Sequence, residues 1–166
     1  DSDAFAPETE TSAESIRALF KGPAELLKER ATVVASSFEA GYEPENMFDG
    51  NPATMWHSAW KTEGPPYPHT VTIDLGKQVD RKGLAGLPRQ DNNRNGRISG
   101  YEVYLSATSD SKGAMLTQGR FPSSDAERYT IRFAQPVTGR YLTLVATSGA
   151  GDESMASLAE IDFLVE

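Results

Sequence analysis

The segment Met55-Trp-His-Ser-Ala-Trp60 holds both tryptophans of the chain and one of its two histidines. In a β-strand, successive side chains point to opposite faces, so Trp56, Ser58 and Trp60 would share one face and His57 would lie on the other. A site that uses both His57 and Trp60 therefore requires the chain to leave strand geometry between them. An aromatic ring next to polar planar groups is the chemistry that grips a sugar, since the ring covers an apolar sugar face and the polar groups hold hydroxyls.

A second polar segment could supply the remaining contacts of such a site. Residues 89–95 read Arg-Gln-Asp-Asn-Asn-Arg-Asn and follow an apolar run. Arg89 offers a rigid fork of N–H donors that suits two neighbouring hydroxyls. The alternative is that Trp60 and Tyr67 cover one end of a sandwich and that Arg89 forms a salt bridge. The residues alone leave both interpretations open.

Asn46, Asp49, Asn51 and Thr54 are closely spaced in a turn-rich segment. Closely spaced oxygen donors suit Ca²⁺, which takes six to eight oxygen ligands. The segment is not an EF-hand, so backbone carbonyls would supply several ligands, and Glu160 could join from the last predicted strand. An ordinary turn at 49–52 is the equal alternative.

The sequence gives little support for catalysis. His57 and His69 are the only histidine bases, and no G-x-S-x-G motif, phosphate loop or dinucleotide fingerprint occurs. Whether two carboxylates face each other across a cleft, as in a glycosidase, is not decided by sequence. We predict that the chain is not an enzyme.

From Ala31 onward, short runs with alternating apolar residues are separated by turn residues, as in TVTIDLG, GYEVYLSA and RYLTLVATS. Seven or eight such runs without long helices predict an all-β sandwich of the jelly-roll type. Three long loops, 39–51, 61–69 and 90–100, are candidate functional segments. Residues 1–12 indicate a linker, and residues 12–30 predict two short helical segments, so we divide the chain into an appendage, 1–30, and a β-sandwich domain, 31–166.

The 166-residue chain has a net charge of −8 and no cysteine. The acidic balance argues against nucleic acid and anionic membranes as partners. The absence of cysteine excludes disulfides and thiolate metal sites. No stretch approaches the length of a membrane span, and no signal peptide is visible. The acidic, polar start is typical either of a mature N-terminus or of a piece cut from a longer chain, and both are compatible with an export signal further upstream.

Five ordered stretches carry a family resemblance: FDGNPATMWHSAW, PHTVTIDLG, GLAGLPRQDNNRNGRISGYEVYLS, GRYLTLVATS and SLAEIDF. Together they resemble the discoidin, or coagulation factor 5/8 C-terminal type, β-sandwich. They look most like the family 32 carbohydrate-binding modules attached to bacterial glycoside hydrolases and sialidases, and the N-terminal domain of galactose oxidase is similar. The resemblance covers residues 31–166.

The resemblance implies an eight-stranded jelly roll with a structural Ca²⁺. By position, the implied ligands are two carboxylates, backbone carbonyls and one hydroxyl. They come from Asn46, Asp49, Asn51, Thr54, Ala159 and Glu160.

The resemblance also implies a site for galactose, N-acetylgalactosamine or a lactose-type terminus. His57 and Arg89 would hold the axial O4 and the neighbouring O3, and Trp60 would stack on the sugar ring. Glu39 and Asn95 are the expected further contacts. Met155 departs from the family pattern, which places an aromatic residue there, so stacking on the sugar is expected to be weaker or shifted.

The expected protein is thus a non-catalytic, secreted, monomeric bacterial module that targets an attached catalytic domain to its glycan. Two alternatives remain: a discoidin-type domain that binds a protein or a phospholipid headgroup, and a structural spacer with a decayed sugar site. The geometric expectation is a buried Trp56, with His57 and Trp60 exposed near Arg89.

Overall fold

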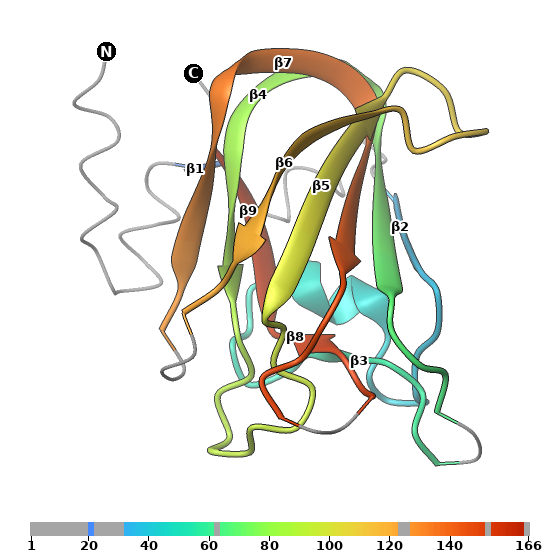
Figure 1. Cartoon of the computed structure of the whole chain (residues 1–166), viewed down its shortest axis with the longest axis vertical. Helices are drawn as coiled ribbons and strands as arrows, with labels where there is room; N and C mark the ends of the chain where they lie inside the picture. Colours follow the sequence, from blue (N-terminus) through green and yellow to red (C-terminus); the bar gives the residue numbers. More distant parts are fainter. Residues whose placement is uncertain (1–19, 22–31, 62–63, 123–126, 152–153, 165–166) are drawn as a thin grey trace.

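The computed structural model describes residues 20–21, 32–61, 64–122, 127–151 and 154–164 (Figure 1). Most of these residues lie in strands. The elements, in chain order, are β1 (Phe20–Lys21), β2 (Thr32–Ala35), the 3₁₀ helix η2 (Pro44–Phe48), β3 (Trp56–His57), β4 (His69–Leu87), β5 (Gly100–Ser106), β6 (Ala114–Arg120), β7 (Tyr129–Ala146), β8 (Ser157–Leu158) and β9 (Glu160–Leu164).

Two long antiparallel strands, β4 and β7, are the central pair of the main sheet. The main sheet has the order β1-β9-β4-β7-β5-β6, with β2 also paired to β4. Residues 69–74 of β4 pair with the end of β7, and residues 83–87 pair with its beginning. Both strands bend over the top of the molecule (Figure 1), so their two halves lie in opposite layers of a sandwich. This confirms the predicted β-sandwich.

The bends explain where the expected strands differ from the observed ones. The sequence predicts TVTIDLG and KGLAGLPR as separate strands, but both belong to β4; likewise RYTIRF and RYLTLVATS both belong to β7. The β4–β7 register shifts between Asp74 and Val79 and again between Arg81 and Gly83. An extra residue at such a bulge bends a strand without ending it. The polar residues between the predicted strands therefore mark bends.

Alternating apolar side chains from both layers fill the core. Val71 and Ile73 of β4 meet Leu142 and Leu144 of β7, and all four are at most 2% exposed. Trp56 and Phe163 are the largest of the fully buried side chains. The predicted burial of Trp56 is confirmed, and its indole N–H donates to the carbonyl of Ser37 at 2.9 Å.

The predicted helical appendage is corrected at two residues. Phe20 and Lys21 pair antiparallel with Leu164 and Phe163 at the edge of the sheet, as strand β1. Backbone pairing with an open strand edge outweighs the weak local helix preference of this segment. The other residues of the predicted helices lie outside the described part of the chain. Among the described residues, no helix is long and apolar enough to cross a membrane.

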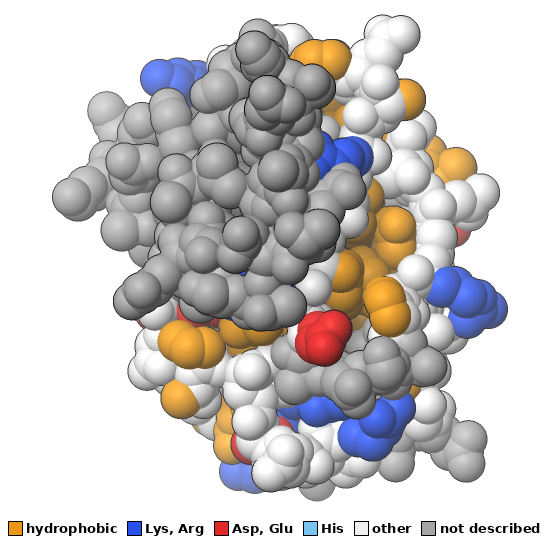
Figure 2. Space-filling view, turned by 90° about the vertical axis from the view of Figure 1, so that its left-hand side faces the viewer, with side chains coloured by type: hydrophobic (Ala, Val, Ile, Leu, Met, Phe, Trp, Pro, Cys, Tyr) orange, Lys and Arg blue, Asp and Glu red, His pale blue; other side chains and the backbone are white. Residues whose placement is uncertain are grey.

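Figure 2 shows the side of the molecule to the left in Figure 1. Lys and Arg side chains on this face lie in separate groups between hydrophobic and uncharged ones. The described side chains that this view shows form no continuous basic surface.

Candidate functional site

The loops at the lower end of the sandwich in Figure 1 enclose a hollow of about 350 Å³. We call it the loop hollow. It is lined by side chains from four separate segments of the chain: Tyr42, His57, Trp60, Arg89, Asn93, Asn95 and Met155. Of the five predicted sugar contacts, His57, Trp60, Arg89 and Asn95 therefore come together, and Glu39 is not among the lining residues.

The chain leaves strand geometry directly after His57. Strand β3 ends there, and Ser58 exchanges two hydrogen bonds with Ala156: its N–H donates to the Ala156 carbonyl at 2.8 Å, and its hydroxyl accepts from the Ala156 N–H at 2.9 Å. This clamp turns the following residues away from Trp56. The rings of His57 and Trp60 consequently meet edge to face, with centroids 4.4 Å apart.

His57 is only 3% exposed, so the expectation of an exposed imidazole is wrong. The ring lies under Trp60 and Tyr42 and still reaches the loop hollow. Its Nδ1–H donates to the Ser58 carbonyl at 2.8 Å. Burial is the main cause that lowers the pKa of His57 below its ordinary value of 6.5, and the nearby Arg89 adds to it. The imidazole is thus neutral at pH 7, and Nε2, which bonds no described residue, is an acceptor.

Arg89 is held rigidly at 7% exposure. Its Nε–H and one Nη2–H donate to the two carboxylate oxygens of Asp91 at 2.9 and 2.8 Å, and Nη1 donates to the Asn95 carbonyl at 2.8 Å. The bonds from Arg89 lower the pKa of Asp91. The alternative salt bridge therefore exists, but it uses only part of the guanidinium. Of the five N–H donors, two bond no described residue and remain for a ligand.

The sequence reasoning missed Tyr42 and Asn93. The Tyr42 ring packs edge-on against Trp60 with centroids 5.2 Å apart, and forms a wall beside it. Asn93 accepts the N–H of Asn95 at 2.8 Å, which fixes the turn that carries both amides. The Asn-rich composition of residues 92–95 was a signal for Asn93. No local pattern marks Tyr42, because it meets Trp60 only through the fold.

Met155 forms part of the opposite wall. Two side chains at the start of β4 hold this loop: the Tyr67 hydroxyl, just before the strand, donates to the Met155 carbonyl, and Nε2 of His69, its first residue, donates to the Ser154 carbonyl at 2.5 Å. These bonds hold the loop that carries Met155 against the loop hollow.

Glu39 supports the site from outside it. One carboxylate oxygen accepts the N–H groups of Trp60 and Lys61 at 2.8 and 3.1 Å. These backbone bonds are the main causes that lower the pKa of Glu39. Glu39 therefore fixes the backbone of the turn that carries Trp60.

The predicted metal loop is built from oxygen atoms and lies beside β9. The Asp49 carboxylate accepts the Asn51 N–H at 2.8 Å and the Thr54 hydroxyl. The Asn46 amide donates to the Met55 carbonyl at 3.0 Å, and Met55 packs against Leu87 and Ala159. The next residue after Ala159 is Glu160, which is 3% exposed.

This donor set fits a hard cation. It combines carboxylate, hydroxyl and carbonyl oxygens, the ligands that Ca²⁺ prefers. In the described residues there is no group of three or more His, Cys, Asp or Glu side chains that could hold a metal. A cation here would accordingly need backbone carbonyls, as the resemblance implies.

The bent sandwich and its loop hollow define a discoidin-like domain. Residues 32–161 match the model of the F5/8 type C domain, and the chain belongs to this family. Galactose oxidase from Gibberella zeae is 37% identical over 131 residues, which cover 78% of this chain and 19% of that protein. A sialidase from Micromonospora viridifaciens is 35% identical over 118 residues, 70% of this chain and 18% of the sialidase.

Among solved structures, the family 32 carbohydrate-binding module of C. perfringens NanJ, determined in complex with galactose, superposes with a TM-score of 0.71. It shares 26% sequence identity, and the match covers 82% of this chain and 93% of the module. The present chain spans about a fifth of the length of the two curated relatives.

Proposed function

We propose that this domain is a non-catalytic carbohydrate-binding module that takes galactose-configured sugars in the loop hollow. One observation carries the proposal: the fold brings an aromatic ring, a neutral imidazole acceptor and a fixed guanidinium together in one small hollow. The galactose-bound relative with the same fold supports the choice of ligand.

The chemistry of the hollow matches a pair of neighbouring sugar hydroxyls. His57 Nε2 accepts from one hydroxyl, and the two remaining N–H groups of Arg89 donate to the pair. Trp60 covers the apolar face of the ring, which in galactose is unobstructed because O4 is axial. In glucose the equatorial O4 points away from the donors and leaves the buried polar groups without partners, which weakens binding.

Calcium is the second part of the proposal. Asp49, Thr54 and Glu160, with the carbonyls of Asn46, Asn51 and Ala159, would hold one Ca²⁺. The ion would pin the loop after η2 to β9, close to the base of the loop hollow, and would act on stability alone. The oxygen-rich donor set beside β9 supports this assignment.

A module with a single small site binds weakly. Attachment to a catalytic domain, or to further modules, raises the effective concentration at the glycan surface. The curated relatives, an oxidase and a sialidase, are several times longer than this chain. We therefore propose that the domain targets a secreted bacterial enzyme to glycans with terminal galactose or N-acetylgalactosamine.

The test is a calorimetric titration of the domain with galactose, N-acetylgalactosamine, lactose and glucose. We expect binding of the first three at millimolar concentrations and at least a several-fold weaker response to glucose. The absence of measurable binding to every galactose-configured sugar at tens of millimolar would contradict the proposal. Binding to anionic lipid vesicles instead would favour the lipid-binding alternative.

A further inference from the structure

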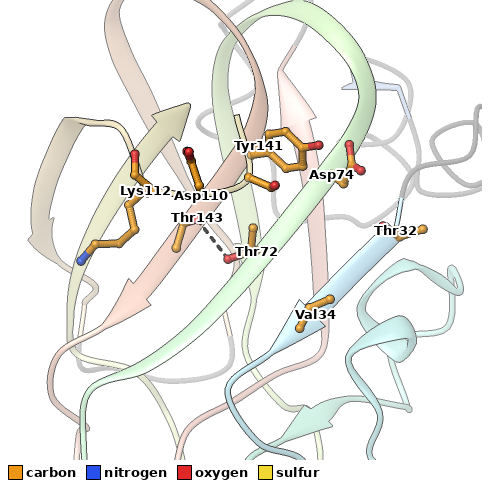
Figure 3. A pocket seen from close by; sticks show the side chains of 10 residues that line it. Thr32, Val34, Thr72, Asp74, Asp110, Lys112, Tyr141 and Thr143 are labelled. Atoms are coloured by element: carbon orange, nitrogen blue, oxygen red, sulfur yellow. Dashed lines mark hydrogen bonds between the residues drawn. The ribbon is translucent and has the colours of Figure 1, made fainter. Parts of the chain in front are cut away.

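A second hollow of about 410 Å³ lies on the outer face of the sheet, away from the loop hollow (Figure 3). We call it the sheet-face groove. Its floor is the hydrogen-bonded pair of Thr72 and Thr143 hydroxyls, 3.0 Å apart. Tyr141 lies above this pair, and Val34 of strand β2 lies on one side of it. The loop 107–113 forms the other side, toward the end of the sandwich opposite the loop hollow (Figure 1).

The register of the strands explains why these side chains share one face. Thr72 lies opposite Thr143 in the β4–β7 pair and opposite Val34 in the β2–β4 pair. Asp74 lies opposite Tyr141, one step along the same face. Alternate residues of these strands point into the core, so the outward set forms a continuous row across three strands.

The rim loop is preformed. Thr108 donates its N–H to the Ser106 hydroxyl at 3.0 Å and its hydroxyl to Asp110 at 2.6 Å. Gly113 closes the loop with φ of +80°, and a Cβ there would lie 2.2 Å from the Leu105 carbonyl oxygen. Only glycine fits this turn. A ligand would therefore meet a rim that needs little ordering, which lowers the cost of binding.

The groove has balanced charge. Asp74 forms two hydrogen bonds with the Arg140 guanidinium, at 2.7 and 3.1 Å, which neutralises it. Asp110 and Lys112 on the rim carry opposite charges, and the Lys112 ammonium lies 4.4 Å from the centre of the Tyr104 ring. The lining therefore offers no net charge to an ionic ligand.

The groove combines an aromatic ring with hydroxyl groups. The phenol of Tyr141 and the hydroxyl of Thr32 bond no described residue. Arg140 covers Tyr141 at 5.0 Å from the ring centre, and Val34, 66% exposed, adds an apolar surface on the other side. An apolar surface framed by hydroxyls and without net charge complements a neutral sugar chain better than an ion or a purely apolar molecule.

We propose that the sheet-face groove binds a neutral oligosaccharide, at a site separate from the loop hollow. Its volume falls within the roughly 300–1,000 Å³ typical of small-molecule sites. Occupying both sites on one polysaccharide would raise the affinity through effective concentration. The proposal does not depend on the galactose site, because the two hollows share no residue.

The experiment uses the whole chain with the Trp60→Ala substitution, which disables the loop hollow. Amide chemical shifts are followed by NMR during titration with cellohexaose, xylohexaose, mannohexaose and a β-1,4-galactotetraose. We expect at least one of these sugars to shift the amides of Thr72, Lys112 and Thr143. Tyr141→Ala should weaken that binding at least tenfold, and Phe38→Ala, which removes an exposed ring outside both hollows, should leave it unchanged.

Two charged probes complete the test: an oligogalacturonate and a glucosamine oligomer. We expect both to bind more weakly than the best neutral sugar. No shift at the groove with any neutral sugar at tens of millimolar overturns the proposal, as does full binding by the Tyr141→Ala variant. Preference for a charged probe overturns the assignment of a neutral ligand.

Discussion

Trp56 and Trp60 lie four residues apart and have opposite surroundings. Trp56 is 1% exposed and fixed in the core, whereas Trp60 lines the loop hollow and is partly exposed. The Ser58–Ala156 clamp between them is what separates their roles. Two residues of the same type in one short segment thus lie in the core and in the candidate site, respectively.

This difference predicts opposite outcomes for two alanine variants. Trp60→Ala should lose at least tenfold in galactose affinity while remaining folded, because its ring is partly exposed at the loop hollow. Trp56→Ala should lower the free energy of unfolding by about 3–5 kcal/mol, as large core truncations do. Calorimetric titration and urea denaturation of both variants check this; a Trp60→Ala variant that binds normally would contradict the site.

His57 predicts a pH dependence of binding. Because its pKa in the folded domain is below 6.5, the neutral acceptor form dominates at pH 7 and above, and affinity should be constant there. As the pH falls through the lowered pKa, Nε2 becomes a donor facing Arg89, and affinity should fall. The pKa of Asp91 is lowered, so its pair with Arg89 persists over this range. Isothermal titrations between pH 4.5 and 8 measure the effect.

The same proton uptake also acts on stability. The folded state binds this proton less tightly than the unfolded chain, so the contribution of His57 is present above pH 6.5 and is lost as the pH falls through the folded pKa. The folded fraction must therefore be followed at each pH by near-ultraviolet circular dichroism. A His57→Gln variant that keeps the full pH dependence of binding would contradict the assignment.

At the scale of elements, the loop hollow depends on bonds between segments far apart in sequence. Glu39, in the loop after β2, holds the backbone of Trp60 and Lys61. Tyr67 and His69 hold the segment that carries Met155. The sequence marked three long loops as candidate functional segments, and residues of two of them, 39–51 and 90–100, line the loop hollow. It did not show which loop supports which.

Glu39 offers a test of support against direct contact. A glutamine at this position still presents an oxygen to the two N–H groups, so Glu39→Gln should keep galactose affinity within about twofold. Glu39→Ala leaves both N–H groups without that acceptor and should weaken binding several-fold with little change in melting temperature. Titration of both variants decides the matter: equal losses in Gln and Ala would indicate that the carboxylate itself contacts the sugar.

At the scale of the whole molecule, the two ends of the sandwich are built differently. The loops at one end form the hollow, and the bends of β4 and β7 close the other end (Figure 1). Met55, next to the proposed calcium loop, packs with Leu87 and Ala159, and Tyr42 of the loop hollow packs against this cluster. None of the proposed calcium ligands is among the residues that line the loop hollow, so the ion should act on stability.

Calcium removal tests this role in stability. An ion that binds only the native state at about 100 times its dissociation constant adds about 2.7 kcal/mol, so chelation should lower the melting temperature by roughly 5–10 °C. The melting temperature of the Asp49→Ala variant should be the same with and without calcium. Calorimetric scans with added calcium or with EDTA measure both. An unchanged melting temperature of the parent domain on chelation would contradict the calcium site.

The sequence by itself determined the β-sandwich and the residue types of the site, because alternation of apolar residues and the local motifs around His57 and Arg89 are short-range patterns. It also predicted the burial of Trp56. Only the tertiary structure showed that β4 and β7 are single bent strands, that His57 is buried, that Glu39 supports Trp60 and that Tyr42 forms a wall. These features rest on contacts between distant segments, which depend on how the sheet bends and pairs and leave no periodic signal in the chain.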